Sequence, residues 1–171
     1  MSAFFRFPHT PHLAWLGPGA PRDDKVLAAN EATALLAGEV VVEEKLDGAN
    51  LGISLAEDGA LRFQNRGQYL HQPFAGQFQR LGGWIAAHEE ALRRELSPGL
   101  ILFGEWCAAR HSVAYDRLPD WLIVFDAYDR SEHKFFSTAR RDALAQRLGL
   151  AVVRTVSRGR TTLADLTKRL R

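Results

Sequence analysis

Apolar residues in this chain fall into short alternating stretches and a few longer periodic ones, a mixture typical of sheets combined with helices. Alternation or short apolar runs predict strands at 40–44, 50–56, 61–65, 100–103, 121–125 and 151–153. Apolar residues at helical spacing, in segments bounded by helix-ending residues such as glycine and proline, predict helices at 24–37, 77–96, 138–148 and 161–171. Hairpin signals such as Asp58-Gly59 link several strands, so the fold class is α+β, with mainly antiparallel sheets flanked by helices.

The first 22 residues do not fit either period. They are rich in proline, glycine and aromatic residues, and proline both fixes the backbone and removes a hydrogen-bond donor. We therefore expect an extended arm at 1–22.

Composition narrows the class of protein. With 171 residues, 46% of them hydrophobic, the chain can build one domain with a core. The net charge of +2 permits contact with nucleic acid without requiring it. Cys107 is the single cysteine, which excludes an internal disulfide, and we expect it to pack in the core. No signal peptide or membrane-spanning run is evident, so the sequence predicts a soluble, cytoplasmic protein with no membrane partner and no obligate protein partner.

Lysine is scarce in this chain, so few residues are candidates for a nucleophilic amine. The chain has eighteen arginines but four lysines, and only lysine readily loses its proton to become a nucleophile. Lys45 lies in Glu44-Lys45-Leu46-Asp47-Gly48-Ala49-Asn50, between two predicted strands. A strand end followed by a tight turn would project its amine while Gly48 lets the backbone approach a phosphate. A surface turn with a salt-bridged lysine would produce the same short pattern.

The context of this segment favours the chemical interpretation. It resembles motif I of the covalent nucleotidyltransferases, and three later segments resemble further motifs of their RNA ligases in the same order. These segments are Gln64-Asn65-Arg66-Gly67-Gln68-Tyr69-Leu70, Phe103-Gly104-Glu105-Trp106 and Ile123-Val124-Phe125-Asp126-Ala127-Tyr128-Asp129. The resemblance implies that 1–171 is part of an adenylyltransferase (ATP-grasp-like ligase) domain of the ATP-dependent RNA ligase family, similar to T4 RNA ligase 2.

The resemblance also implies roles for individual residues. Lys45 is the expected nucleophile that takes up AMP from ATP. Residues expected to bind the nucleotide are Glu44, Lys45, Asp47, Asn50, Arg66, Glu105 and Phe125. Glu105 would also serve a Mg²⁺ or Mn²⁺ ion, and Arg66 and Asp126 would contact nucleic acid. The plainer alternatives are a salt-bridging Arg66, a solvated Glu105 and a Phe125 that packs in the core.

Two motifs of the family are not found. No Glu-Gly follows Asp129, and Lys168 stands without a second lysine where the family carries a Lys-x-Lys pair. The domain is therefore expected to be incomplete at its C-terminus, and the chain alone weakly active or inactive. The predicted function is sealing of 5′-phosphate to 3′-hydroxyl ends in nicked or broken RNA, or an RNA/DNA duplex. A DNA ligase, a capping guanylyltransferase and a non-catalytic nucleic-acid-binding remnant remain as alternatives.

Overall fold

The computed structural model describes residues 4–19, 21 and 25–169 and divides them into two compact units. The first unit comprises the chain up to Arg6 together with Lys45–Val153, and the second comprises Phe7–Glu44 and the segment from Arg154 onward. Within the described residues, no helix has the length and apolar character needed to cross a membrane.

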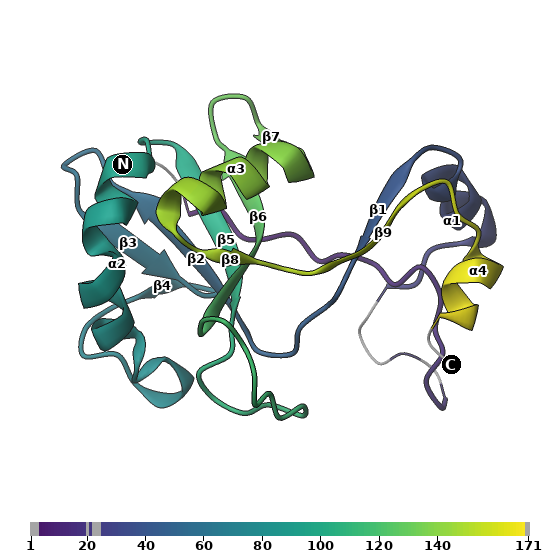
Figure 1. The fold of residues 1–171 in the computed structure, drawn as a ribbon, viewed down its shortest axis with the longest axis horizontal. Coiled ribbons are helices and arrows are strands. Elements are labelled where there is room, and N and C mark those ends of the chain that lie inside the picture. Colours follow the sequence, from purple (N-terminus) through teal and green to yellow (C-terminus); the bar gives the residue numbers. More distant parts are fainter. Residues whose placement is uncertain (1–3, 20, 22–24, 170–171) are drawn as a thin grey trace. The chain divides into compact units, whose positions relative to one another are not determined.

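The first unit is built on a seven-stranded sheet, visible with its helices in Figure 1. Six strands follow the order β4-β3-β2-β5-β6-β7 with antiparallel neighbours, and β8 pairs in parallel with β6. Their bounds are β2 Ala49–Leu55, β3 Leu61–Gln64, β4 Tyr69–Leu70, β5 Leu100–Trp106, β6 Leu122–Asp129, β7 Lys134–Phe135 and β8 Ala151–Val152. The predicted α+β class with mainly antiparallel strands is confirmed.

Two helices pack on one face of this sheet, α2 (Leu81–Glu95) and α3 (Thr138–Leu148). The apolar residues that alternate along β2, β5 and β6 meet the buried sides of both helices in one core. The predicted helix 77–96 is divided, because a 3-10 turn at Gly76–Phe78 precedes α2. Helix α3 has the predicted bounds, with a Ser137 hydroxyl cap at one end and a left-handed Gly149 at the other.

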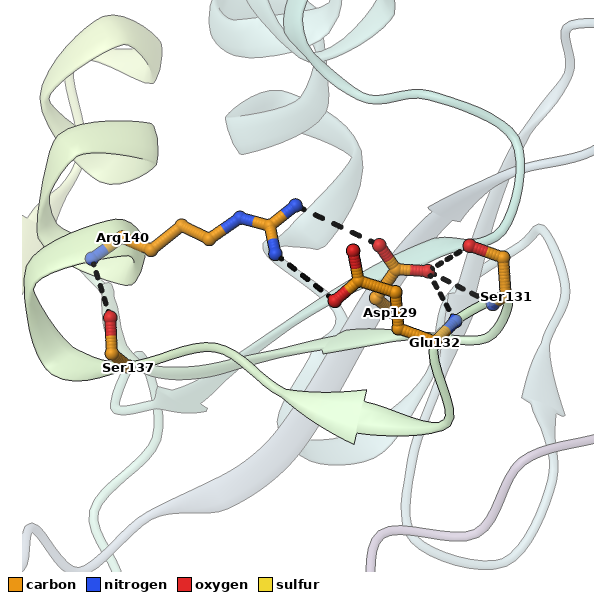
Figure 2. A network of polar contacts seen from close by, with 5 residues as sticks. All are labelled: Asp129, Ser131, Glu132, Ser137 and Arg140. Atoms are coloured by element: carbon orange, nitrogen blue, oxygen red, sulfur yellow. Dashed lines mark hydrogen bonds and ion pairs between the residues drawn. The ribbon is translucent and has the colours of Figure 1, made fainter.

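The turn between β6 and β7 is fixed by a polar network (Figure 2). The Asp129 carboxylate accepts hydrogen bonds from the backbone amides of Ser131 and Glu132 and from the Ser131 hydroxyl. Arg140 of α3 forms ion pairs with Asp129 and Glu132. The network therefore ties the turn to the first turns of α3.

Register in the sheet decides which side chains share a face. Strand β6 carries a β-bulge: Gly104 pairs with Val124 and Phe103 with Asp126, so Phe125 is an extra residue. Across β2, β5 and β6 the pairs Asn50–Glu105 and Glu105–Ile123 place these three side chains on the face away from α2 and α3.

The second unit contains a two-stranded antiparallel sheet and two short helices. Strand β1 (Val40–Glu43) pairs with β9 (Thr155–Gly159), and α1 (Ala29–Leu36) contacts α4 (Leu163–Lys168). Strand β9 was not predicted, since its polar sequence lacks a period-2 apolar pattern.

The observed helices near both ends of the chain are shorter than predicted. The helix predicted from residue 24 begins at Ala29, because the backbone of 25–27 is engaged by His12: His12 N–H donates to Lys25 O and Leu27 N–H to His12 O. The helix predicted at 161–171 is shorter, Leu163–Lys168, and its last two residues lie outside the described chain. The arm is free of helix over its described residues, while residues 1–3, 20 and 22 lie outside them.

Candidate functional site

The site is centred on the turn Lys45–Gly48, which leads into β2. Leu46 anchors the turn, since it is only 7% exposed and packs in a small apolar cluster with Ile123 and Val153. Gly48 lies so close to β5 that a Cβ at this position would stand 2.6 Å from the Trp106 carbonyl oxygen. Glycine at this position therefore permits close approach of the backbone to a protein strand, while its predicted approach to a phosphate stays a prediction.

Glu105 of β5 holds the other end of the turn. Its Oε1 accepts a hydrogen bond from the Gly48 N–H at 2.9 Å. Burial raises the pKa of the Glu105 carboxyl, and the Gly48 hydrogen bond and the positive charges of Lys45 and Arg66 act in the opposite direction. Both cations therefore act electrostatically on this half-buried carboxylate.

Asn50 lies on the same face, directly opposite Glu105 in the β2–β5 pair. Its Oδ1 atom is buried and finds no hydrogen-bond partner in the described part of the chain. Buried polar atoms in folded proteins nearly always have a partner, so an orphan at a site is a position where a ligand group can complete the bonding. This observation fits the predicted nucleotide-binding role of Asn50.

Arg66 is exposed in the tight turn between β3 and β4. Asn65 shapes this turn, because its Oδ1 accepts from the backbone amides of Gly67 and Gln68. The Arg66 carbonyl accepts from Arg6 Nε at 3.1 Å, so the N-terminal arm contacts the same turn.

The arm is also held by aromatic contacts that the sequence did not predict. The Phe5 ring stacks on Tyr128 with 3.8 Å between centroids, and the Phe5 carbonyl accepts from Gln64 Nε2 at 2.7 Å. Gln64 is 1% exposed, so this bond is shielded from solvent.

Phe125 is the extra residue of the β6 bulge and is half-buried beside Leu46 in the apolar cluster. Its carbonyl accepts a 2.8 Å hydrogen bond from Arg141, a buried arginine of α3 that also pairs with Asp142. Phe125 thus packs partly against apolar neighbours, as the core-packing alternative expects. Stacking of its ring on a nucleobase stays a prediction. Asp126 is half-buried, and its Oδ1 accepts from the Ala127 amide.

Asp47 is engaged by a loop that sequence reasoning did not single out. Its Oδ2 accepts from the backbone amides of Ser112 and Val113, at 2.9 and 3.1 Å, and from the Ser112 hydroxyl. These bonds, the Ser112 hydroxyl first, lower the pKa of the Asp47 carboxyl. The Asp47 N–H in turn donates to the Tyr115 hydroxyl at 2.7 Å. No local pattern marks Ser112 or Tyr115, because the contacts join residues more than sixty positions apart.

Glu44 belongs to the second unit. Its backbone N–H donates to Arg154 O at 2.9 Å, and its carboxylate forms an ion pair with the Arg154 side chain at 3.2 Å. The prediction that Glu44 accepts from an adenine amino group stays a prediction.

The donor set suits a nucleotide better than a protein-bound metal. Asn50, Glu105 and Arg66 offer the hydrogen-bonding and charged groups that ribose and phosphate require. Among the described residues, no three or more His, Cys, Asp or Glu side chains are arranged to hold a metal ion. A Mg²⁺ or Mn²⁺ ion here would take most of its oxygen ligands from phosphate and water, with Glu105 as the predicted protein contact.

The chain is similar in sequence and in fold to known proteins. The family model described as RNA ligase matches residues 38–170. The Naegleria gruberi RNA ligase with PPi is similar in structure, with a TM-score of 0.59, 19% identity, and coverage of 71% of this chain and 37% of that chain. An archaeal ATP-dependent RNA ligase gives a TM-score of 0.54 at 23% identity, with 71% and 32% covered.

A K326A mutant of the Naegleria enzyme with ATP and Mn covers more, 88% of this chain and 48% of that one, with a TM-score of 0.58 at 16% identity. The chain thus spans less than half the length of these structures, and at such identities the likeness concerns the fold. No curated protein sequence matches the chain.

Proposed function

Because the chain belongs to the RNA ligase family, we propose that it carries the nucleotide-accepting centre of an ATP-dependent RNA ligase, with Lys45 as the residue that takes up AMP. The observation that carries this proposal is the turn Lys45–Gly48 fixed against Glu105, with the orphan Asn50 oxygen on the same face. Predicted residues of the segment 45–50 and Glu105, which lies more than fifty positions further along the chain, come together in one small region, and this supports a nucleotide-binding role.

In the proposed first step, the neutral Lys45 amine attacks the α-phosphorus of ATP. A phosphorus–nitrogen bond forms, the bond to the bridging oxygen of pyrophosphate breaks, and the amine proton is released to solvent. Arg66 is assigned to the phosphates or to a strand end, and Glu105 to the ribose hydroxyls. Phe125 is assigned to the face of the nucleobase, where stacking contributes about 1–3 kcal/mol.

The proposed second and third steps use the strand break. The 5′-phosphate displaces Lys45 from AMP, and the 3′-hydroxyl then attacks that phosphate, so that a phosphodiester forms and AMP leaves. Asp126 and Arg66 are assigned to the polynucleotide. A divalent cation would supply charge neutralisation on the phosphates.

The natural substrate is proposed to be nicked or broken RNA in strand repair. Structures of the similar Naegleria gruberi RNA ligase contain ATP and Mn or AMP and Mn, which supports the same nucleotide and a divalent metal here. The low yield expected of this chain has a physical reason: no lysine pair was found in the sequence to balance charge on the α-phosphate.

The test is prolonged incubation with α-labelled ATP and Mg²⁺ or Mn²⁺, followed by mass spectrometry of the peptide containing Lys45. We expect a low yield of AMP on Lys45, none on the Lys45→Arg variant, and loss of the label after addition of a 5′-phosphorylated nicked RNA duplex. Wild-type chain that carries no AMP at the detection limit would contradict the proposal. Salt-dependent binding of nicked duplex by such an inactive chain would identify the non-catalytic alternative.

A further inference from the structure

A long loop joins β5 to β6 and carries none of the predicted site residues. It comprises residues 107–121, and its base is closed by a 2.7 Å hydrogen bond from the Cys107 amide to the Trp121 carbonyl. Ordered loops of this length in compact units are usually functional. Its contacts show which part of the site it serves.

The loop grips the turn Lys45–Gly48 through both polar and apolar groups. Ser112 and Val113 supply three donors to the Asp47 carboxylate, and the Tyr115 hydroxyl accepts from the Asp47 amide. Tyr115 also packs against the apolar cluster that contains Leu46. These contacts engage the two residues that directly follow Lys45.

The contacts leave the turn little freedom. The amide of Asp47 is bonded to Tyr115 and the amide of Gly48 to Glu105, so both peptide planes after Leu46 are fixed. Each such bond contributes about 0.5–1.5 kcal/mol, and those that involve a carboxylate contribute more. A backbone held in this way presents the Lys45 side chain from a fixed origin, which is the precondition for in-line attack on phosphorus.

We infer that loop 107–121 is a clamp on the Lys45–Gly48 turn, with Ser112 and Tyr115 as positioning residues for Lys45. Neither residue touches the reacting atoms; both act through Asp47. The inference rests on the proposed function, in which Lys45 is the nucleophile.

The kinetic test uses Ser112→Ala and Tyr115→Phe, each of which removes one hydroxyl and little volume. Misplacement of a nucleophile by an ångström can cost about a hundredfold in rate. We therefore expect roughly tenfold to a hundredfold slower lysyl-AMP formation at saturating ATP. The ATP concentration for half-maximal rate should stay near the wild-type value, because both variants keep every predicted nucleotide contact, including the Asp47 carboxylate and its two backbone donors from Ser112 and Val113. Ser112→Thr keeps the hydroxyl and should restore most of the rate.

A matched control exists in the same unit. Ser131 makes the same pair of hydrogen bonds to Asp129, through its amide and its hydroxyl, in the network of Figure 2. Ser131→Ala removes an equivalent hydroxyl outside the proposed site, so the AMP uptake of this variant should equal that of wild type. An equal loss of rate in Ser131→Ala and Ser112→Ala would indicate general destabilisation and overturn the inference.

A second readout separates the clamp from the proposed function. Amide hydrogen exchange should be about fivefold or more faster at Asp47 in Tyr115→Phe, and unchanged there in Ser131→Ala. If the wild-type chain takes up AMP and the two clamp variants do so at the same rate, the clamp is overturned and the proposed function stands. If the wild type takes up no AMP, the proposed function fails, and exchange at Asp47 decides the clamp: faster exchange supports it, unchanged exchange overturns it.

Discussion

The backbone amide of Gly48 donates to Oε1 of Glu105 at 2.9 Å, although 57 positions separate the two residues in the sequence. The hydrogen bond joins the turn after Lys45 to the middle strand of the sheet. It depends on the absence of a side chain at position 48, because a Cβ there would lie within 3.1 Å of Cys107 Sγ and of Glu105 Cγ.

Gly48→Ala should therefore reduce both stability and AMP uptake. Relief of the 2.6 Å contact with the Trp106 carbonyl requires movement of backbone, and such overpacking typically costs about 1–3 kcal/mol. Guanidinium unfolding measures the change. Gly83→Ala is the control: nothing lies near its Cβ position in α2, so the free energy of unfolding should rise by about 0.5–1 kcal/mol. Equal effects of the two substitutions would show that close approach at Gly48 is unimportant.

Asn50→Leu should separate stability from function. Its Oδ1 is buried without a partner, so an apolar side chain of similar shape should leave the free energy of unfolding unchanged or raise it by up to about 1 kcal/mol. Lysyl-AMP formation should nevertheless fall by roughly tenfold or more, since a ligand contact is lost.

The comparison for Asn50 is Gln64→Leu, measured by the same unfolding experiment. The Gln64 amide donates to the Phe5 carbonyl, so its loss should destabilise the chain by about 1–2 kcal/mol. A stability loss in Asn50→Leu as large as that in Gln64→Leu would contradict the assignment of Asn50 as a group awaiting a ligand.

Arg141→Met should be strongly destabilising. This buried arginine, 2% exposed, joins α3 to the bulge carbonyl of Phe125, and its removal leaves a buried acceptor without this donor. We expect a loss of about 2–4 kcal/mol in thermal or guanidinium unfolding. Arg147 lies on the same helix as Arg141 but is exposed, and Arg147→Met breaks its ion pair with Glu95 of α2, which should cost less than about 1 kcal/mol. Similar losses in both variants would contradict the special role of Arg141.

Cys107 should react slowly with alkylating reagents. Burial, followed by the charges of Glu105 and Asp47, raises the pKa of its thiol from 9.0 to about 11. At pH 9 the folded chain should therefore offer roughly fiftyfold less thiolate than the unfolded chain, and react correspondingly slowly with iodoacetamide. Reaction of the folded chain as fast as that of the guanidinium-unfolded chain would contradict the raised pKa.

The raised pKa of the Cys107 thiol should also make the stability of the chain depend on pH in the alkaline range. Because the thiol pKa is higher in the folded chain, its contribution to stability is complete below pH 9 and decreases as the pH rises toward 11. Cys107→Ser or Cys107→Ala should therefore lose less of its free energy of unfolding between pH 8 and pH 10.5 than the wild type. Guanidinium unfolding at the two pH values measures the difference.

Local signals explain which elements could be predicted from the sequence. Helix α3 has its predicted bounds because Ser137 and Gly149, next to it in the chain, end it on both sides. The predicted start of α1 was wrong, because the backbone just before the helix is hydrogen-bonded to His12, and no local sequence pattern reveals that contact. The two-residue strands β4 and β7 are too short to show a period.

For the site, the sequence supplied residue types and order but not their partners. Lys45, Asn50 and Glu105 were predicted from motif resemblance, and register in the β2–β5 pair brings Asn50 opposite Glu105. Ser112 and Tyr115 could not be predicted, since their contacts with Asp47 depend on how a fifteen-residue loop closes over the turn. Long-range hydrogen bonds of this kind follow from tertiary packing and leave no periodic trace.

The extra residue at Phe125 has a consequence for natural variation in this strand. Residues 122–124 and 126–129 alternate in opposite phase, so Val124 and Ala127 both face the helices although three positions separate them. Deletion of either residue between them, Phe125 or Asp126, would give Val124 and Ala127 the two-residue spacing of a regular strand, so that both could still face the helices. Such a deletion would thus remove an aromatic or an acidic side chain that is predicted to serve the site, while the core stayed intact.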